Sequence, residues 1–310
     1  MDQNNRSSMI PFYLVTGFLG SGKTTLLRRI LEDYADSQKI GIIQNEFAPA
    51  NVDGTDLKSS GKPFEILEIN KGSVFCVCLL SSFIDSLGAF IDQEAPDLIF
   101  LEASGLADPI SIGELLDAPE LNQKIYLAHT MCIVDASKFL EMEPRMTRIT
   151  HQVRIADTVV INKTDLGGDI EAIQRRIKEL NPYAEVVNAT YCDIAFHRIL
   201  QEQPADPVAV KQSRDLSALE PGGRPDIRSV VIRTSRPVAR EQLDRFLEKY
   251  IPKTYRMKGY VKLSDGSALA LQTSFEQYSS ETLPNYNGNT EIIAMGDNIS
   301  PREMRKMFIP

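Results

Sequence analysis

GFLGSGKT, residues Gly17 to Thr24, directly follows the apolar segment 10–15 and fits the pattern GxxxxGK(S/T) of a phosphate-binding loop. Its glycines allow successive backbone N–H groups to turn inward around the α- and β-phosphates of a nucleotide. The helix-like segment TTLLRRILEDY behind it points its positive end at the same phosphates. A plain glycine-rich turn requires neither this helix nor the preceding strand, so we interpret the loop as a nucleotide site. The residues predicted to bind the nucleotide here are Gly20, Ser21, Gly22, Lys23, Thr24 and Thr25.

Two regions supply the predicted catalytic groups and the magnesium ligands. Lys23 brings a positive charge to the β- and γ-phosphates, and the hydroxyl of Thr24 is a ligand for Mg²⁺. Glu102 ends an apolar strand-like segment, where a carboxylate typically reaches Mg²⁺ directly or through water, and the N–H of Gly105 senses a γ-phosphate. A helix N-cap built on Ser104 is the alternative interpretation of this second region.

The sequence NKTD predicts that the base is guanine. The carboxylate of Asp165 can accept both N1–H and the N2 amino group of guanine, while the Lys163 stem packs along the base and Asn162 steadies the loop. A site built to bond one edge of a base rejects an analogue that lacks it, because buried polar groups would stay unpaired. At the next strand end, the backbone N–H of Ala189 is predicted to reach the guanine carbonyl. Asp135 ends another strand, and whether it is a functional or a plain loop carboxylate stays open.

Apolar strand-like segments alternate with helical patterns through the first two-thirds of the chain. Such segments, separated by helices, predict an α/β fold of the P-loop NTPase type, a mostly parallel sheet covered by helices. Ligands then bind beyond the carboxyl ends of the strands. The predicted strands are 10–16, 39–44, 64–69, 97–102, 130–135, 157–161 and 184–189. The predicted helices are 22–35, 79–93, 111–117, 145–156 and 168–180.

Segment 201–227 interrupts this alternation. It contains four prolines and the pair Gly222-Gly223 without a periodic apolar face, so it is interpreted as a linker. We therefore predict a P-loop GTPase domain at 1–200 and a small α+β domain at 228–310. The elements predicted for the second domain are a strand at 229–235, a helix at 239–250, strands at 255–263, 268–273 and 290–295, and a hairpin turn at 263–267.

The composition is that of an ordinary globular protein, with 43% apolar and 25% charged residues. A formal net charge of −8 argues against non-specific nucleic-acid binding, which requires a basic face. No apolar segment is long enough to cross a bilayer, and the polar start MDQNNRSSM lacks the apolar core of a signal peptide. Four cysteines in 310 residues do not resemble a disulfide framework. We therefore expect a cytoplasmic protein that binds neither membranes nor nucleic acid.

Several features together resemble the CobW-type P-loop GTPases, relatives of the GTPases that assist nickel insertion into hydrogenase and urease. They are the sequences GFLGSGKTT, EASGLADP, CIVDAS and QVRIADTVVINKTD and the small C-terminal domain, in the family order and over essentially the whole chain. The resemblance implies GTP or GDP with Mg²⁺ as cofactors, and slow GTP hydrolysis coupled to delivery of a metal ion or metal-containing cofactor to a client protein. It also implies that Asp53 of the first switch segment approaches Mg²⁺ when GTP is bound.

The transition-metal site of this family is only partly matched. Its members usually carry CxCC after a glycine, and many read ENEFG, whose leading glutamate also binds the metal. Here the loop GSVFCVC keeps Cys76 and Cys78 without a third cysteine, and Gln44 stands in the place of the glutamate. Two thiolates at i, i+2 on an extended segment can reach one Zn²⁺ or Co²⁺ ion, but a closed tetrahedral zinc site needs two more donors. The pair is therefore either a metal site or two small buried residues, and Cys132 and Cys192 are predicted to be core residues.

Three hypotheses for the function follow. In the first, Mg²⁺·GTP draws segments 44–53 and 102–108 onto the γ-phosphate and reshapes the cysteine loop of a metal-delivering switch. The second is a metal-independent GTPase chaperone that gates cofactor loading of a client enzyme, favoured by Gln44 and the missing third cysteine. The third, a P-loop kinase, would need a phosphate acceptor site and no guanine reader. No arginine or glutamine stands out as a finger or water-orienting group, so we predict slow turnover that a client protein or a homodimer contact accelerates.

Overall fold

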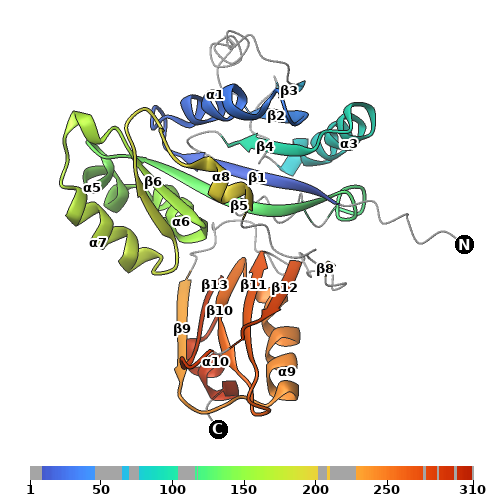
Figure 1. Cartoon of the computed structure of the whole chain (residues 1–310), viewed down its shortest axis with the longest axis vertical. Helices are drawn as coiled ribbons and strands as arrows, with labels where there is room; N and C mark the ends of the chain where they lie inside the picture. Colours follow the sequence, from blue (N-terminus) through green and yellow to red (C-terminus); the bar gives the residue numbers. More distant parts are fainter. Residues whose placement is uncertain are drawn as a thin grey trace, which may run out of the picture. The chain divides into compact units, whose positions relative to one another are not determined.

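The computed structural model describes residues 9–45, 65–69, 77–103, 116, 118–201, 208–209, 228–274, 277–284, 286–296 and 299–308. Contacts divide the chain into two compact units, Met1–Gln203 and Pro204–Pro310. Figure 1 draws the first in colours from blue to yellow and the second from orange to red. The division falls at the start of the proline-rich segment.

The first unit is built on a seven-stranded sheet in which every pair of neighbouring strands is parallel. Its order is β3-β2-β4-β1-β5-β6-β7, which confirms the predicted α/β fold. β4 and β6 are buried at every residue, because helices cover both faces of a parallel sheet. The strands are β1 (Ile10–Gly17), β2 (Ile40–Asn45), β3 (Glu65–Ile69), β4 (Leu98–Glu102), β5 (Ile125–Asp135), β6 (Thr158–Asn162) and β7 (Glu185–Asn188).

Alternate residues of β5 face two separate cores. Met131 and Ile133 lie in the core with α1 (Lys23–Tyr34) and α8 (Phe196–Gln201). Cys132 and Val134 lie in the core with α5 (Phe139–Met142), α6 (Thr147–Ile155) and α7 (Ile170–Leu180). Successive side chains of a strand point to opposite faces, so each face is covered by its own helices, as Figure 1 illustrates. The other helical segments in the described part of this unit are α3 (Val77–Glu94), η2 (Glu143–Arg145) and η3 (Thr164–Leu166).

The structure differs from the sequence prediction at the short elements of this unit. α5 and α8 have four and six residues, too few for a periodic apolar face, and neither was predicted. β5 begins at Ile125 rather than at residue 130 because its first residues pair with β1. Most of the helix predicted at 111–117 lies outside the described residues.

Parallel pairing brings the carboxyl ends of β1, β4 and β6 to one edge of the sheet. β1 lies between β4 and β5, so the chain crosses over in both directions from it. Open α/β sheets bind ligands at such a switch point, beyond the carboxyl ends of the strands. The phosphate loop, Glu102 and the NKTD loop all lie at this edge.

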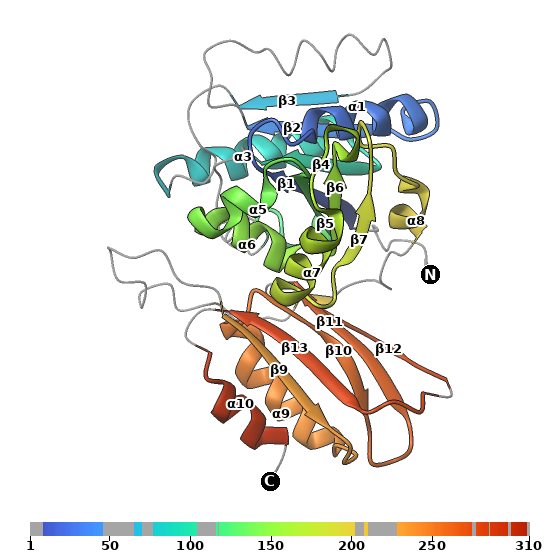
Figure 2. The same ribbon diagram turned by 90° about the vertical axis from the view of Figure 1, so that its left-hand side faces the viewer.

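The second unit is a six-stranded antiparallel sheet in the order β8-β12-β11-β10-β13-β9. Two helices pack on it through one apolar core (Figure 2). In this core the rings of Phe246 and Phe308 pack edge to face with their centroids 4.5 Å apart. The strands are β8 (Val208–Ala209), β9 (Arg228–Thr234), β10 (Arg256–Lys262), β11 (Ala268–Ser274), β12 (Gln277–Thr282) and β13 (Thr290–Gly296). The helical segments are α9 (Arg240–Tyr250), η5 (Ile251–Lys253) and α10 (Pro301–Phe308).

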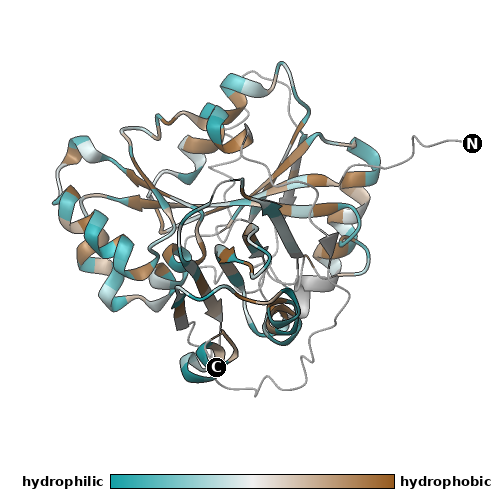
Figure 3. Cartoon of the chain, turned by 60° about the horizontal axis from the view of Figure 1, so that its bottom comes forward, coloured by the Kyte–Doolittle hydropathy of each residue, from teal (hydrophilic) through white to brown (hydrophobic). Residues whose placement is uncertain are grey.

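The hairpin predicted at 263–267 is confirmed, since β10 and β11 pair across it and Gly266 has a φ of 88°. β12 was not predicted because QYSSET is too polar, and α10 was not predicted because it is short. Within the segment predicted as a linker, the two residues of β8 pair with β12 at the sheet edge. None of the described helices is long and apolar enough to cross a membrane, and they carry hydrophilic and hydrophobic residues side by side (Figure 3).

Candidate nucleotide site

The loop after β1 has the backbone that a phosphate-binding loop requires. Gly20 and Gly22 have φ angles of 73° and 116°, a conformation that side chains with a Cβ rarely adopt. A Cβ on Gly22 would also lie 2.4 Å from the Nδ2 of Asn162, so this position admits only glycine. Ser21 is buried between them, and its N–H donates to the carbonyl of Phe18 at 3.1 Å.

Lys23 is the first residue of α1, and its side chain lies against the phosphate loop, as predicted. Its ammonium donates to the carbonyl oxygens of Gly17 at 3.0 Å and Phe18 at 3.3 Å, and the residue is only 7% exposed. These two bonds hold the positive charge inside the loop, where a phosphate group would meet it. Thr25 follows in the same helical turn and is half-buried.

Thr24 and Glu102, two of the predicted magnesium ligands, are in direct contact. The hydroxyl of Thr24 donates to the Oε1 of Glu102 at 3.0 Å, and the Nε2 of Gln44 donates to its Oε2 at 3.2 Å. Glu102 and Gln44 are 7% and 3% exposed, so this hydrogen-bond network is buried at the carboxyl ends of β4 and β2. Mg²⁺ prefers a few oxygen ligands of this kind, completed by water and phosphate oxygens. The residues present therefore fit Mg²⁺, with Thr24 and Glu102 as the groups that would hold it.

Asn162 joins the NKTD loop to the phosphate loop. Its Nδ2 donates to the carbonyl of Ser21 at 2.8 Å, and its Oδ1 accepts from the backbone N–H of Cys192 at 2.9 Å. The Cys192 thiol in turn donates to the carbonyl of Gly22 at 3.3 Å. The predicted steadying role of Asn162 thus has a physical basis: one buried amide binds three loops together.

Lys163 forms an ion pair with Asp135, the carboxylate whose role the sequence left open. Nζ of Lys163 lies 2.8 Å from Oδ2 of Asp135, and the other carboxylate oxygen, Oδ1, accepts from the N–H and hydroxyl of Ser137 at 3.0 and 2.6 Å. Burial raises the pKa of Asp135, but the hydrogen bonds from Lys163 and Ser137 outweigh it and hold that pKa below its ordinary value. Asp165, two residues after Lys163, is exposed to solvent in η3.

The role predicted for the Ala189 amide requires a correction. Its N–H donates to the carbonyl of Ile161 at 2.8 Å and so continues the pairing of β7 with β6. The carbonyl of Ala189 accepts from both the N–H and the hydroxyl of Thr164, at 3.2 and 3.1 Å. Ala189 therefore fastens the NKTD loop to β7 instead of offering an N–H to a base.

Arg29 of α1 secures the loop that follows β7. Its Nε donates to the carbonyl of Tyr191 at 2.7 Å, and its Nη1 lies 3.4 Å from a carboxylate oxygen of Asp193. Tyr191 and Cys192 have φ angles of 52° and 55°, which non-glycine residues adopt only where the surroundings hold them. Sequence patterns gave no signal for this connection, because it depends on two residues far apart in the chain.

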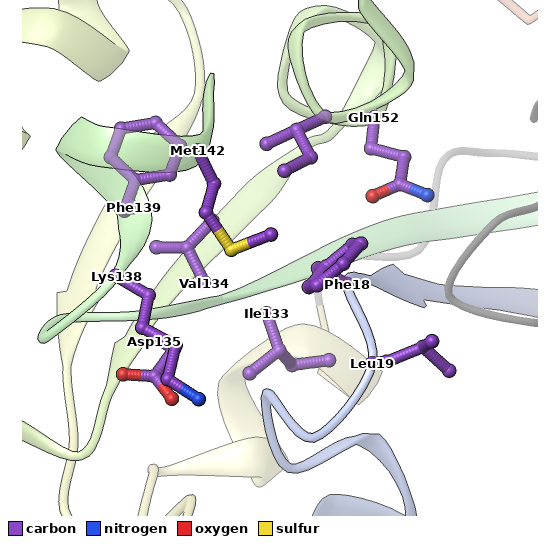
Figure 4. A pocket seen from close by; sticks show the side chains of 10 residues that line it. Phe18, Leu19, Ile133, Val134, Asp135, Lys138, Phe139, Met142 and Gln152 are labelled. Carbon is purple, nitrogen blue, oxygen red and sulfur yellow. The ribbon is translucent and has the colours of Figure 1, made fainter. Parts of the chain in front are cut away.

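A small apolar cavity lies beside the phosphate loop (Figure 4). It is lined by residues of this loop, the end of β5, α5 and α6, among them Phe18, Leu19, Ile133 and Phe139. Its volume of about 20 Å³ is room for about one water molecule, so it does not hold a nucleotide or another ligand of that size.

Several predicted site residues are not described by the structure. Asp53, Gly105 and Cys76 lie outside the described residues. α3 begins at Val77, so the backbone of Cys78 is helical and the extended conformation predicted there is wrong. Among the described residues, no group of three or more His, Cys, Asp or Glu side chains is arranged to hold a metal ion. Cys132 and Cys192 are buried, which confirms them as core residues.

Known proteins resemble this chain in both units. The family model "CobW/HypB/UreG, nucleotide-binding domain" matches residues 11–188, and "Cobalamin synthesis protein cobW C-terminal domain" matches residues 227–309. Zinc chaperone YjiA of Escherichia coli is 30% identical over 262 residues, which cover 79% of this chain and 80% of that protein. Zinc chaperone CobW of Sinorhizobium sp is 31% identical over 184 residues, 51% of each protein.

Zinc-regulated GTPase metalloprotein activator 1 of Saccharomyces cerevisiae is 25% identical over 271 residues, which cover 78% of this chain and 63% of that protein. The crystal structure of the Zn(II)-bound YjiA GTPase from E. coli has the same fold, with a TM-score of 0.66 and 24% identity over 96% of this chain and 98% of that one. The chain therefore belongs to the CobW/HypB/UreG family of nucleotide-binding proteins, with a CobW-type C-terminal domain.

Proposed function

We propose that this protein binds and slowly hydrolyses GTP, and that its nucleotide state controls delivery of a metal ion or metal-containing cofactor to a client protein. One observation carries the proposal: Asn162 of the NKTD loop bonds the phosphate loop, and Thr24 of that loop bonds Glu102. These bonds support the proposal because they join the proposed base-reading loop, the phosphate loop and the two proposed Mg²⁺ ligands at one edge of the sheet.

Each group has a separate task in this proposal. The Lys23 ammonium and the backbone N–H groups of Gly20 to Thr24 bind the phosphates. Thr24 and Glu102 hold Mg²⁺, which when bound neutralises the charge that develops on the phosphate oxygens. Asp165 reads N1–H and N2 of guanine, and its exposure leaves the carboxylate accessible to a base.

The relatives support a metal as the cargo. Those that carry the names zinc chaperone and zinc-regulated GTPase metalloprotein activator match at 25–31% identity. We propose Cys76 and Cys78 as the cargo ligands, and Asp53 and Gly105 as groups that respond to the γ-phosphate. The second unit, with a sheet and a core of its own, is the proposed surface that selects the client.

Calorimetry with GDP, GTP and ATP in the presence of Mg²⁺ tests the nucleotide part. We expect GDP and GTP to bind and Asp165→Ala to reduce the preference for guanine over adenine nucleotides at least tenfold, since it removes a charged acceptor from a paired edge. Asp169→Ala is the matched control, because this nearby exposed aspartate caps α7 through the N–H of Ala172. Absence of heat with GDP and GTP, or full discrimination by Asp165→Ala, would contradict the proposal.

The metal part is tested by the effect of Zn²⁺ or Co²⁺ on hydrolysis. The double variant Cys76→Ala, Cys78→Ala should lose both the metal and its effect on the rate. Gln44 favours a second candidate, a metal-independent GTPase chaperone that gates cofactor loading, because its amide bonds Glu102 and brings no negative charge for a metal. Stoichiometric metal in the anaerobically purified protein, held by the two thiols, would eliminate this second candidate.

A further inference from the structure

Gln44 lies at the carboxyl end of β2, in register with Glu102 of β4. Its Nε2 donates to one oxygen of the Glu102 carboxylate, and the hydroxyl of Thr24 donates to the other. An ionised carboxylate can only accept hydrogen bonds, so the amide must turn its NH₂ group toward Glu102. The Oε1 of Gln44 consequently faces away from Glu102, and this orientation follows from chemistry alone.

This Oε1 is a buried acceptor in a site that otherwise offers donors and ligands for a nucleotide. It has no hydrogen-bond partner in the part of the chain that the structure describes, and the residue is 3% exposed. A buried acceptor is unfavourable unless a donor comes to it. Phosphate oxygens cannot be that donor because they are acceptors themselves, and two of the three N–H groups of the Lys23 ammonium donate to the carbonyls of Gly17 and Phe18. A water molecule fits the requirement.

We propose that Gln44 positions the water molecule that attacks the terminal phosphate of GTP, with its Oε1 accepting a hydrogen bond from that water. This inference rests on the GTP hydrolysis proposed above. The water oxygen forms a bond to the γ-phosphorus while the bond from that phosphorus to the β–γ bridging oxygen breaks. GDP leaves with the electron pair of that bond, and the water protons pass to the phosphate product and to solvent.

The amide takes no proton in this step, and its contribution is orientation. The hydrogen bond to Glu102 holds the Gln44 side chain in one rotamer. The Glu102 carboxylate, which also accepts from Thr24, thereby orients the Oε1 of Gln44 toward the water. In this proposal Gln44 is a positioning residue, a role for which no glutamine stood out in the sequence.

The test is the Gln44→Met variant, which keeps the side-chain length and removes both amide atoms. We expect single-turnover GTP hydrolysis to slow by at least about tenfold, as for the loss of one preorganised hydrogen bond in a transition state, with GDP affinity within about threefold of the unmodified protein. A second readout is the extra GDP affinity gained with aluminium fluoride and Mg²⁺. This mimic of the transferring phosphoryl group binds with an in-line water, so Gln44→Met should lose most of that gain.

Gln38→Met is the matched control. Gln38 also has a buried Oε1 without a partner among the described residues, but it precedes β2, at the opposite end of the strand from the phosphate loop. The same chemical change there should leave hydrolysis and fluoride binding unchanged. Gln44→Asn, which withdraws the oxygen by one methylene, is expected to slow hydrolysis as Gln44→Met does and takes its place if that variant does not fold.

Two results would overturn the inference. One is unchanged hydrolysis and fluoride binding in the folded Gln44 variants, and the other is a parallel, equal loss of GDP affinity, which would mean a general effect on the site. Failure of the proposed function is distinguishable, because the unmodified protein would then bind no guanine nucleotide at all.

Discussion

The Nδ2 of Asn162 donates to the carbonyl oxygen of Ser21 at 2.8 Å, across 141 residues of sequence. On its other side, Asn162 accepts from the backbone N–H of Cys192 at 2.9 Å. One amide thus connects the phosphate loop, the NKTD loop and the loop after β7. These hydrogen bonds hold the NKTD loop and the phosphate loop in a fixed position relative to each other.

Asn162→Ala should weaken both folding and nucleotide binding. The change leaves a carbonyl and an N–H unpaired around a residue that is 2% exposed, which costs about 2–4 kcal/mol in the free energy of unfolding. We expect at least a tenfold loss of GDP affinity and a lower melting temperature, measured by calorimetry and by thermal unfolding. Asn188→Ala is the control, since the Asn188 amide accepts from Gln174 at the surface at 3.3 Å. Normal GDP binding by Asn162→Ala would mean that the loops align without this amide.

Asp135→Asn should loosen the guanine site without unfolding the protein. It removes the negative charge 2.8 Å from the Lys163 ammonium, so the lysine stem is held less firmly in the position from which it is proposed to pack along the base. GDP affinity should fall about 3- to 10-fold, in line with roughly 1 kcal/mol for a partly buried charged hydrogen bond. Asp92→Asn is the control, because its pair with Lys124 is exposed and lies outside the site.

The pH dependence of this ion pair has a definite sign. Since the pKa of Asp135 is lowered by folding, the pair is intact above the ordinary value of 3.8 and is lost as the pH falls through the lowered pKa. Titrations of GDP affinity should therefore show no contribution from Asp135 between pH 6 and 8. A change of affinity in that range that disappears in Asp135→Asn would contradict the assignment.

Local patterns predicted the parts of the site that lie within one segment. The loop Gly17–Thr24 and the NKTD sequence have fixed spacing, and unbroken apolar strands predicted the parallel sheet. Contacts between residues of separate strands have no sequence pattern. The bonds of Gln44 to Glu102 and of Asp135 to Lys163 depend on strand order and could not be predicted from the sequence. The role predicted for Ala189 was wrong for the same reason, since its N–H is used by the pairing of β7 with β6.

Glu143→Gln should destabilise the first unit at neutral pH but not at acidic pH. The buried Glu143 accepts two bonds from Arg176, at 2.9 and 3.1 Å, and one from Thr150 at 2.7 Å. Burial raises the pKa of Glu143, but the bonds from Arg176 and Thr150 outweigh it and hold that pKa below its ordinary value of 4.5. Its stabilisation is therefore present above pH 4.5 and lost as the pH falls through the lowered pKa.

The size of this effect is limited by solvent, because the Arg176 side chain is 38% exposed. We expect Glu143→Gln to lower the free energy of unfolding by about 1–3 kcal/mol at pH 7, measured by urea titration, with the difference shrinking toward zero near pH 3. Glu141→Gln is the control, since its pair with Arg145 is exposed on both sides and should contribute under about 0.5 kcal/mol. Equal effects of the two variants would refute a special role for Glu143.

Thiol labelling separates the buried cysteines from the proposed cargo ligands. Burial raises the pKa of Cys132 and of Cys192 to about 12, so at pH 8 roughly one molecule in ten thousand carries either thiolate. Iodoacetamide followed by mass spectrometry should modify Cys76 and Cys78 in the native protein, and all four cysteines after unfolding. Rapid native labelling of Cys192 would contradict its packing against Gly22. Because Cys132 and Cys192 do not react in the native protein, any decrease of labelling on addition of Zn²⁺ reports on Cys76 and Cys78 alone. If Zn²⁺ does not decrease their labelling, the cysteine loop is ruled out as the cargo site.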